Sequence, residues 1–170
     1  MQHVARLRGA LVGLCALALL LVGCASRFIP NTDVEDTEEN RTIVAFCEQY
    51  RKAVESKDVP ALLSLASPQY YEDGGNVDAS DDMDYVRLKQ YLTAKYQNVG
   101  FSDASAIRHE IRYRRVSKDK DRNLVMVDYT YTGSFRFVLP DGGEKWQNAV
   151  EENRLELMPE GESYKIISGM

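Results

Sequence analysis

The sequence is poor in the residues and motifs on which many enzyme sites are built. Histidine occurs twice and cysteine three times among 170 residues. No stretch matches HExxH, CxxC, GxSxG, GxGxxG or a Walker phosphate-binding loop. These absences remove the usual sequence support for a metalloprotease, a thiol-redox protein, a serine hydrolase or a nucleotide-binding enzyme. We also expect no bound cofactor and no metal.

A long apolar run stands at the N-terminus. It extends from Gly9 to Gly23 and follows a short basic stretch with Arg6 and Arg8. Its apolar centre is too short to cross a membrane comfortably, which takes about 20 residues. A basic start, a short apolar centre and small residues before a cleavage site are typical of a secretory signal peptide. We therefore expect residues 1–23 to be removed on export.

The sequence around the expected cleavage site, Leu21-Val22-Gly23-Cys24, resembles the bacterial lipobox. In that motif the cysteine sulfur receives diacylglycerol, the preceding peptide bond is cut, and the new amino terminus is often acylated. Several acyl chains bind far more firmly than one, because each buried methylene adds about 0.8 kcal/mol. The resemblance implies a cell-envelope lipoprotein anchored through Cys24, and Ala25 favours the outer membrane in a Gram-negative cell. An uncleaved membrane helix and a chance cysteine after an ordinary signal are the alternatives.

Charge and cysteine usage limit what the exported chain can bind. Cleavage would remove two of the 21 basic residues and none of the 26 acidic ones, changing the net charge from −5 to −7. Nucleic acid is therefore a poor partner, because its binding depends on neutralising phosphates. Cys15 would leave with the signal and Cys24 would carry lipid, so Cys47 has no disulfide partner. It lies on the apolar face of a predicted helix, and we interpret it as a core thiol.

The rest of the chain divides into a tether, helices and strands. Residues 24–36 lack periodicity and are interpreted as a flexible tether, which could reach at most about 40 Å. Apolar periodicity and caps predict helices from Thr37 to about Lys57, over about 58–66, and from about Asp82 to Asn98. Alternating patterns then predict strands over about 107–114, 125–137, 145–158 and 164–168.

Three helices followed by a four-stranded antiparallel meander predict an α+β fold. From residue 37 to 170 the chain resembles the nuclear transport factor 2-like superfamily, also called SnoaL-like or cystatin-like. The resemblance is carried by this element order and by two passages, ESKDVPAL at 55–62 and ESYKIISG at 162–169. It implies a cystatin-like cone with a pocket at its mouth. Some members are isomerases, dehydratases or cyclases, and many others bind ligands or partners without catalysis.

Several side chains are candidates for that pocket. His109, the only histidine after the signal peptide, shares a strand face with Ile107, Ile111 and Tyr113 and could act as a general base. A core histidine bonded to a tyrosine or a carbonyl is the alternative. Tyrosines combine an apolar body with a polar tip, which suits an amphipathic ligand, but they could equally fill the core. The candidate ligand-binding residues are Tyr50, Tyr70, His109, Tyr113, Tyr129 and Tyr131.

Two charged groups carry weaker hypotheses. The acidic residues between Asp73 and Asp84 resemble a calcium loop but fail the EF-hand pattern, because Asp81 stands where glycine is needed. We interpret them as a solvated loop with a helix cap. Arg108, Arg112 and Arg114 lie on the predicted outer sheet face, where they either pair with neighbouring acids or receive an acidic partner.

Three functions remain open from the sequence. The first is a non-catalytic envelope lipoprotein whose domain binds a small apolar ligand or another envelope protein. The second is an isomerase or dehydratase that uses His109 as its base. The third is a structural component whose interface is the arginine-bearing sheet face.

Overall fold

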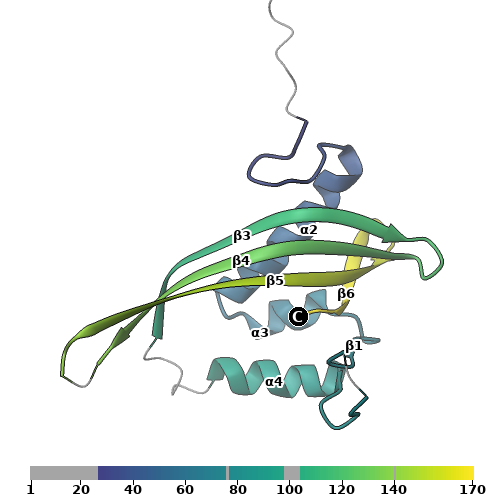
Figure 1. Cartoon of the computed structure of the whole chain (residues 1–170). Helices are drawn as coiled ribbons and strands as arrows, with labels where there is room; N and C mark the ends of the chain where they lie inside the picture. The colour runs from purple at the N-terminus through teal and green to yellow at the C-terminus, as the bar shows by residue number, and fades with distance from the viewer. Residues whose placement is uncertain (1–26, 76, 98–103, 140) are drawn as a thin grey trace, which may run out of the picture.

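Three helices and a four-stranded sheet form most of the part of the chain that the structure describes (Figure 1). The computed structural model describes residues 27–75, 77–97, 104–139 and 141–170, so the expected signal peptide and Cys24 lie outside the described residues. The helices are α2 (Glu38–Glu55), α3 (Val59–Leu65) and α4 (Tyr85–Gln97). Within these ranges, no helix is both long enough and apolar enough to cross a membrane.

Each helix begins at a side chain that accepts a hydrogen bond from its first turn. The Thr37 hydroxyl accepts from the backbone N–H of Asn40 at 3.1 Å, and Asp58 accepts from Ala61 at 2.9 Å. Asp84 accepts from the N–H of Arg87 at 2.8 Å. Such caps satisfy N–H groups that have no partner inside the helix. The predicted helix starts at Thr37 and near residue 58 are confirmed.

The main sheet is an antiparallel meander of β3 (Ala104–Asp119), β4 (Leu124–Val138), β5 (Glu144–Glu160) and β6 (Ser163–Ser168). Neighbours in sequence are neighbours in the sheet, as expected of short antiparallel connections. β3 extends beyond the strand predicted over about 107–114, because it continues to Asp119 and pairs there with Leu124. A separate two-stranded sheet joins β1 (Tyr71–Glu72) to β2 (Met83–Asp84).

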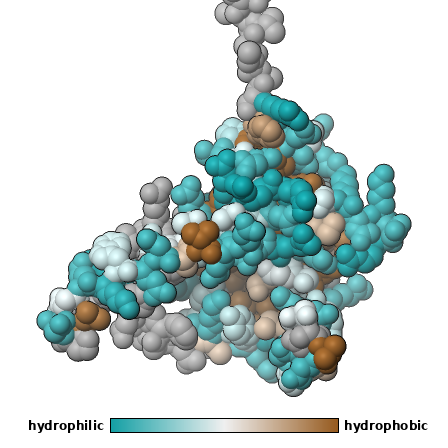
Figure 2. Space-filling view, in the orientation of Figure 1, coloured by the Kyte–Doolittle hydropathy of each residue, from teal (hydrophilic) through white to brown (hydrophobic). Residues whose placement is uncertain are grey.

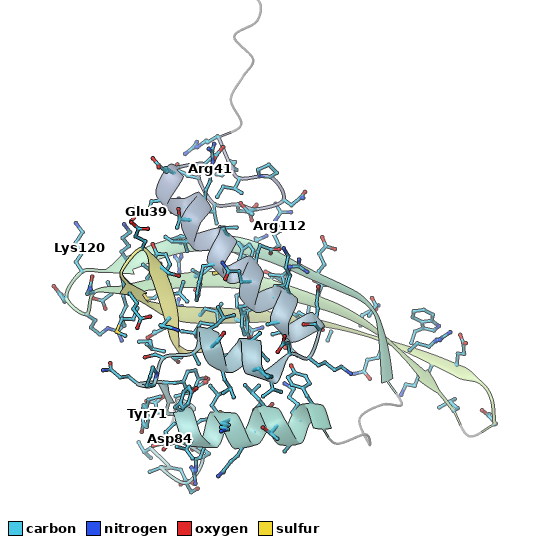
Figure 3. All side chains as sticks on the ribbon, turned by 180° about the vertical axis from the view of Figure 1, so that it is seen from behind. Glu39, Arg41, Tyr71, Asp84, Arg112 and Lys120 are labelled. Atoms are coloured by element: carbon cyan, nitrogen blue, oxygen red, sulfur yellow. The ribbon has the colours of Figure 1, made fainter. Side chains whose placement is uncertain are left out.

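The helices all lie on one face of a curved sheet. Figure 1 shows the uncovered face of the sheet, and Figure 3, seen from behind, shows α2 crossing in front of the sheet with α3 and then α4 beside it. The inward residues of β4 include Val125, Val127 and Tyr129, which belong to the same buried core as Ile43 and Cys47 of α2. The face seen in Figure 2 is mostly hydrophilic, with hydrophobic residues in separate spots. The predicted α+β architecture of three helices on four antiparallel strands is confirmed.

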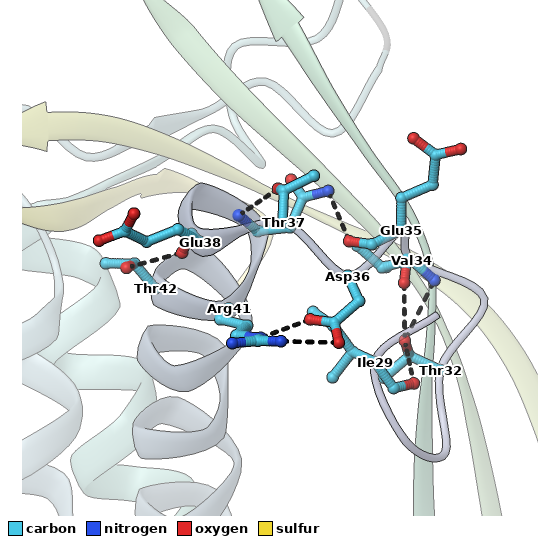
Figure 4. A network of polar contacts seen from close by, with 10 residues as sticks. Ile29, Thr32, Val34, Glu35, Asp36, Thr37, Glu38, Arg41 and Thr42 are labelled. Atoms are coloured by element: carbon cyan, nitrogen blue, oxygen red, sulfur yellow. Dashed lines mark hydrogen bonds and ion pairs between the residues drawn. The ribbon is translucent and has the colours of Figure 1, made fainter. Parts of the chain in front are cut away.

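The segment before α2 is folded, which corrects the prediction of a flexible tether up to residue 36. Val34 is only 3% exposed and belongs to the hydrophobic core. A turn closes on it, because the N–H of Ile29 donates to the carbonyl of Val34 at 2.9 Å and the N–H of Val34 donates to the Thr32 hydroxyl at 3.1 Å (Figure 4). The sequence pattern could not predict this packing, because an irregular segment with one buried valine has no hydrophobic periodicity.

The same segment is fastened to α2 by polar contacts. Asp36 receives two hydrogen bonds from the guanidinium of Arg41, one of them at 2.8 Å (Figure 4). The side-chain amide of Asn40 donates to the carbonyl of Glu35 at 2.9 Å. Residues 27–36 are therefore part of the domain, which begins about ten residues earlier than predicted.

Candidate ligand-binding site

A small cavity lies between the three helices and the C-terminus of the chain. Its volume is about 70 Å³, roughly half that of a cavity of about 150 Å³ that holds benzene. Helix α4 supplies half of its lining, α2 and α3 supply three residues, and the last residue of the chain completes it. The lining residues are Tyr50, Val54, Leu62, Tyr91, Leu92, Lys95, Tyr96 and Met170.

Tyr50 connects this cavity to the inner face of the sheet. Its hydroxyl interacts with that of Tyr129 on β4, and Tyr70 and Tyr96 also lie near it. Burial raises the pKa of Tyr50 well above 10 and that of Tyr129 to about 12. Both phenols therefore stay protonated near neutral pH. Three of the predicted ligand residues, Tyr50, Tyr70 and Tyr129, are brought together in the structure.

Tyr70 holds the end of the chain in place. Its hydroxyl donates to Glu72 at 2.6 Å and accepts from the backbone N–H of Met170 at 3.2 Å. Gly169 makes this path possible, because its φ is +91° and a Cβ there would lie 1.9 Å from the carbonyl oxygen of Arg154. Burial raises the pKa of Tyr70, and the hydrogen bond to Glu72 adds to the effect. Tyr70 thus shapes the cavity through Met170 and is not itself among the lining residues.

The other predicted site residues lie farther along the sheet. The ring of Tyr113 is 6.4 Å from that of Tyr129, and its hydroxyl donates to Glu48 at 2.9 Å. Tyr131 is half-buried, and burial together with Glu151 raises its pKa. Neither residue lines the cavity. The backbone of His109 pairs with Gly133 on β4. The structure describes only the backbone at this position, so it does not place the imidazole.

One charged side chain borders the cavity. The ammonium of Lys95 lies 5.1 Å from the ring centre of Tyr91 and 5.8 Å from that of Tyr96. Both distances are within the range of a cation–π contact. Lys95 is exposed, as is Tyr91, so this side of the cavity faces solvent. A cation therefore stands at the opening of an otherwise apolar and aromatic lining.

The sequence did not single out the residues that give the cavity its opening. Tyr91 and Lys95 stand four residues apart on α4, and Leu92 and Tyr96 repeat the same spacing one position later. Residues four apart lie on the same side of a helix, so the two pairs place four side chains on neighbouring stripes of α4. This spacing is the sequence pattern that could have predicted the opening of the cavity. No sequence pattern indicates that Met170 lines the cavity, because the position of Met170 depends on the turn at Gly169.

A second hollow, of about 630 Å³, lies on the helix-free face of the sheet. Its charges are neutralised within the chain. Asp128 binds Arg115 at 2.8 Å and Arg154 at 2.7 Å, and these hydrogen bonds lower its pKa against the opposing effect of burial. Asp33 pairs with Arg114 at 2.9 Å. Of the arginines predicted on the outer face, Arg112 and Arg114 thus pair with a carboxylate of the same chain, whereas the side chain of Arg108 lies outside what the structure describes.

In the acidic loop between Asp73 and Asp84, carboxylates accept hydrogen bonds from nearby groups of the same chain. Asp73 accepts from the N–H of Gly75 and Asp78 from that of Ser80, both at 2.9 Å. Asp82 accepts from the hydroxyl of Tyr71, and Asp84 caps α4. In the part of the chain that the structure describes, no group of three or more histidine, cysteine or acidic side chains is arranged to hold a metal ion.

Solved structures share this arrangement of helices and sheet. A ketosteroid isomerase-like protein from Erwinia carotovora superposes with a TM-score of 0.53 at 16% identity, covering 78% of this chain and 93% of that one. An uncharacterised protein with a cystatin-like fold from Caulobacter vibrioides gives 0.50 at 16% identity, covering 78% and 87%. The fold is cystatin-like, of the nuclear transport factor 2 type.

Proteins of this fold differ widely in what they do. The β subunit of a benzoate 1,2-dioxygenase from Burkholderia mallei superposes on the chain with a TM-score of 0.54 at 13% identity, covering 79% of this chain and 89% of that subunit. No protein-family model matches the sequence, and no curated protein sequence matches it either. The likeness therefore establishes the fold, and the function has to be argued from the residues of this chain.

Proposed function

We propose that this protein is a membrane-anchored, non-catalytic lipoprotein of the cell envelope that binds a small amphipathic anion. Its apolar part would occupy the cavity between α2, α3 and α4, and its anionic group would bind Lys95. The observation that carries the proposal is the composition of the lining, in which Lys95 is the one charged residue among eight and stands beside the opening. A few polar groups in an apolar pocket are typical of small-molecule sites.

The interior hydroxyls support binding over catalysis. Tyr50 interacts with Tyr129, and Tyr70 is hydrogen-bonded to Glu72 and Met170. Burial raises the pKa of all three phenols, so none exchanges a proton readily near neutral pH. These groups shape and rigidify the cavity instead of acting on a bound molecule.

The cavity volume limits the buried part of the ligand. A space of about 70 Å³ accepts a group smaller than benzene unless side chains move. Tyr91 is 43% exposed and borders the opening, so its rotation would enlarge the entrance. Once Tyr91 has turned outward, a medium-chain fatty acid matches these features, because it joins a thin apolar chain to one negative charge.

Calorimetric titration with decanoate tests the ligand proposal. The wild-type chain should bind decanoate, and Lys95→Glu should weaken binding at least tenfold because it places two negative charges together. Lys89→Glu is the matched control, since Lys89 is exposed on the same helix and does not line the cavity. Equal affinity in both variants, or tighter binding of uncharged decanol than of decanoate, would refute the assigned role of Lys95.

The anchor has its own test. Metabolic labelling with an alkyne-tagged fatty acid should label the wild-type chain, and Cys24→Ser should lose both the label and the removal of residues 1–23. Cys15→Ser is the control, because it changes a cysteine within the expected signal peptide and should keep the label. An unlabelled wild-type chain released into the soluble envelope fraction would exclude lipid anchoring.

The alternative function is a pocket isomerase or dehydratase with His109 as general base. The ketosteroid isomerase-like protein among the structural neighbours favours it. The two functions differ in the fate of the ligand. A ligand recovered unchanged after long incubation supports binding, whereas conversion that His109→Ala abolishes supports the enzyme.

A further inference from the structure

Strand β5 has a long edge that no other strand of the described chain covers. It pairs with β4 along its whole length, but β6 pairs only with residues 156–160. The C-terminal turn approaches as far as the backbone of Arg154. From Glu144 to Asn153, β5 therefore has β4 as its only neighbouring strand among the described residues, and the end of the β4–β5 hairpin extends beyond the helices (Figure 1). We name it the β5 edge.

The β5 edge lacks several of the devices that keep sheet edges from pairing. It contains no proline, and its register with β4 runs without a bulge. It also carries two large apolar side chains in solvent, Trp146 at 54% and Val150 at 69% exposure. A long, regular edge of this kind is a template for another strand, because its outward N–H and C=O groups are unpaired.

We propose that the β5 edge binds the β5 edge of a second copy of this chain, antiparallel, with the two-fold axis at Asn148. Directly opposed residues in such a pair lie on the same sheet face and about 5 Å apart. The axis at Asn148 places Trp146 opposite Val150 of the second copy, twice, on the outer face. It places Lys145 opposite Glu151 of the second copy, twice, on the inner face.

This register is the one that the side chains of the strand favour. An axis at Ala149 would place Trp146 opposite Glu152, and an axis at Gln147 would place Glu144 opposite Val150. Each of these buries a carboxylate beside an apolar group without a partner. The axis at Asn148 also brings Glu144 opposite Glu152, but Arg136 lies 3.2 Å from Glu144 and offsets part of that repulsion.

Cysteine crosslinking in the cells that produce the full-length chain tests the axis. Asn148→Cys should give a dimer on non-reducing gels, because residues on the axis have Cα atoms within disulfide range. Gln147→Cys and Ala149→Cys are the matched controls and should remain monomers, since their counterparts would be about 7–8 Å away. The wild-type chain sets the background from Cys24 and Cys47, and a dimer of the wild-type chain would indicate an unlipidated Cys24.

A charge swap in the Asn148→Cys background provides a second readout. Lys145→Glu should abolish the dimer, and adding Glu151→Lys should restore it, because the two reversed pairs are again opposite in sign. Circular dichroism should show the same fold in all variants, since both residues are exposed. A dimer at position 147 or 149 in place of 148, no dimer at any position, or a product with the mass of a different protein would each overturn the proposal.

Discussion

The carboxylate of Asp33 binds the guanidinium of Arg112, which lies 79 residues farther along the chain. The Nε of Arg112 is 3.2 Å from that carboxylate, and Arg114 binds its other oxygen at 2.9 Å. The N–H of Asp33 also donates to the carbonyl of Tyr113 at 2.9 Å. The N-terminal segment is thus joined to β3 through side chains and backbone. With Cys24 as the anchor, residues 24–26 would hold the fold within about 10 Å of the membrane.

The Asp33–Arg112 contact predicts that the attachment of residues 27–36 to β3 depends on pH. The hydrogen bond from Arg112 lowers the pKa of Asp33 below 3.8, so the contact contributes fully above pH 3.8 and is lost as pH falls through the lowered value. The protection of the Asp33 amide, meaning its intrinsic exchange rate divided by the measured rate, should therefore fall below pH 3.8. Asp33→Asn should exchange faster at neutral pH and lose this pH dependence. Unchanged exchange in Asp33→Asn would show that the ion pairs do not hold the segment.

The contact also changes how a charge reversal of Arg112 and Arg114 should be interpreted. From the sequence, reversal to glutamate tests a partner on the outer sheet face. In the structure the same change would set two glutamates beside Asp33. Loss of a partner after that reversal would therefore also report release of residues 27–36, and Asp33→Asn is the control that separates the two effects.

Val34 gives a direct measure of whether the segment belongs to the domain. Val34→Ala should lower the free energy of unfolding by about 2 kcal/mol, because it removes two buried methyl groups and leaves a small cavity. Val77→Ala is the control and should change it by less than about 0.5 kcal/mol, since Val77 is fully exposed. Chemical denaturation measures both values. Equal values for the two variants would mean that residue 34 is not part of the core.

Cys47 predicts both slow thiol chemistry and sensitivity to alkali. The side chain is fully buried, and burial raises the pKa of its thiol from 9.0 to about 12. The raised pKa contributes stability below pH 9 that is lost as pH rises from 9 toward 12, because the thiol ionises first in the unfolded chain. Alkylation by iodoacetamide at pH 8 should therefore require unfolding. Rapid alkylation of the folded chain would contradict the interpretation as a core thiol.

Gly169 predicts a large effect from one added methyl group. Gly169→Ala would place a Cβ within 1.9 Å of the Arg154 carbonyl, so the C-terminal turn has to move and release Met170 from the cavity. Gly75→Ala is the matched control, because its φ is +71° but nothing lies within 4 Å of its Cβ. The control should cost only the backbone strain, about 1 kcal/mol. Thermal melting should show a clearly larger loss for Gly169→Ala, and equal losses would exclude the collision.

Much of the fold could be predicted because its information is local. The spacing of Ile43, Cys47, Tyr50 and Val54 predicts α2, and the alternation from Val125 to Phe137 predicts β4. Caps at Thr37 and Asp58 fixed two helix starts to within one residue. The packing of residues 27–36 could not be predicted, because it depends on Asp33 meeting Arg112 across 79 residues.

The cavity could be predicted only in part. Inward tyrosines follow from strand alternation, which identifies Tyr129 and Tyr131 together but not which of them approaches Tyr50. That choice depends on where α2 crosses the sheet, and Tyr50 interacts with Tyr129. Met170 reaches the cavity through the left-handed turn at Gly169, whose direction no sequence pattern indicates.

Native mass spectrometry of the chain from residue 27 to 170, purified gently after expression without the anchor, tests the central claim most directly. The binding account predicts one small amphipathic anion per chain, either co-purified or taken up from an envelope lipid extract. Val54→Phe should lose it by filling the cavity, whereas Val86→Phe should keep it, because Val86 is exposed on α4 and does not line the cavity. A chain that stays free of ligand after exposure to the extract, or equal binding by both variants, would contradict the account.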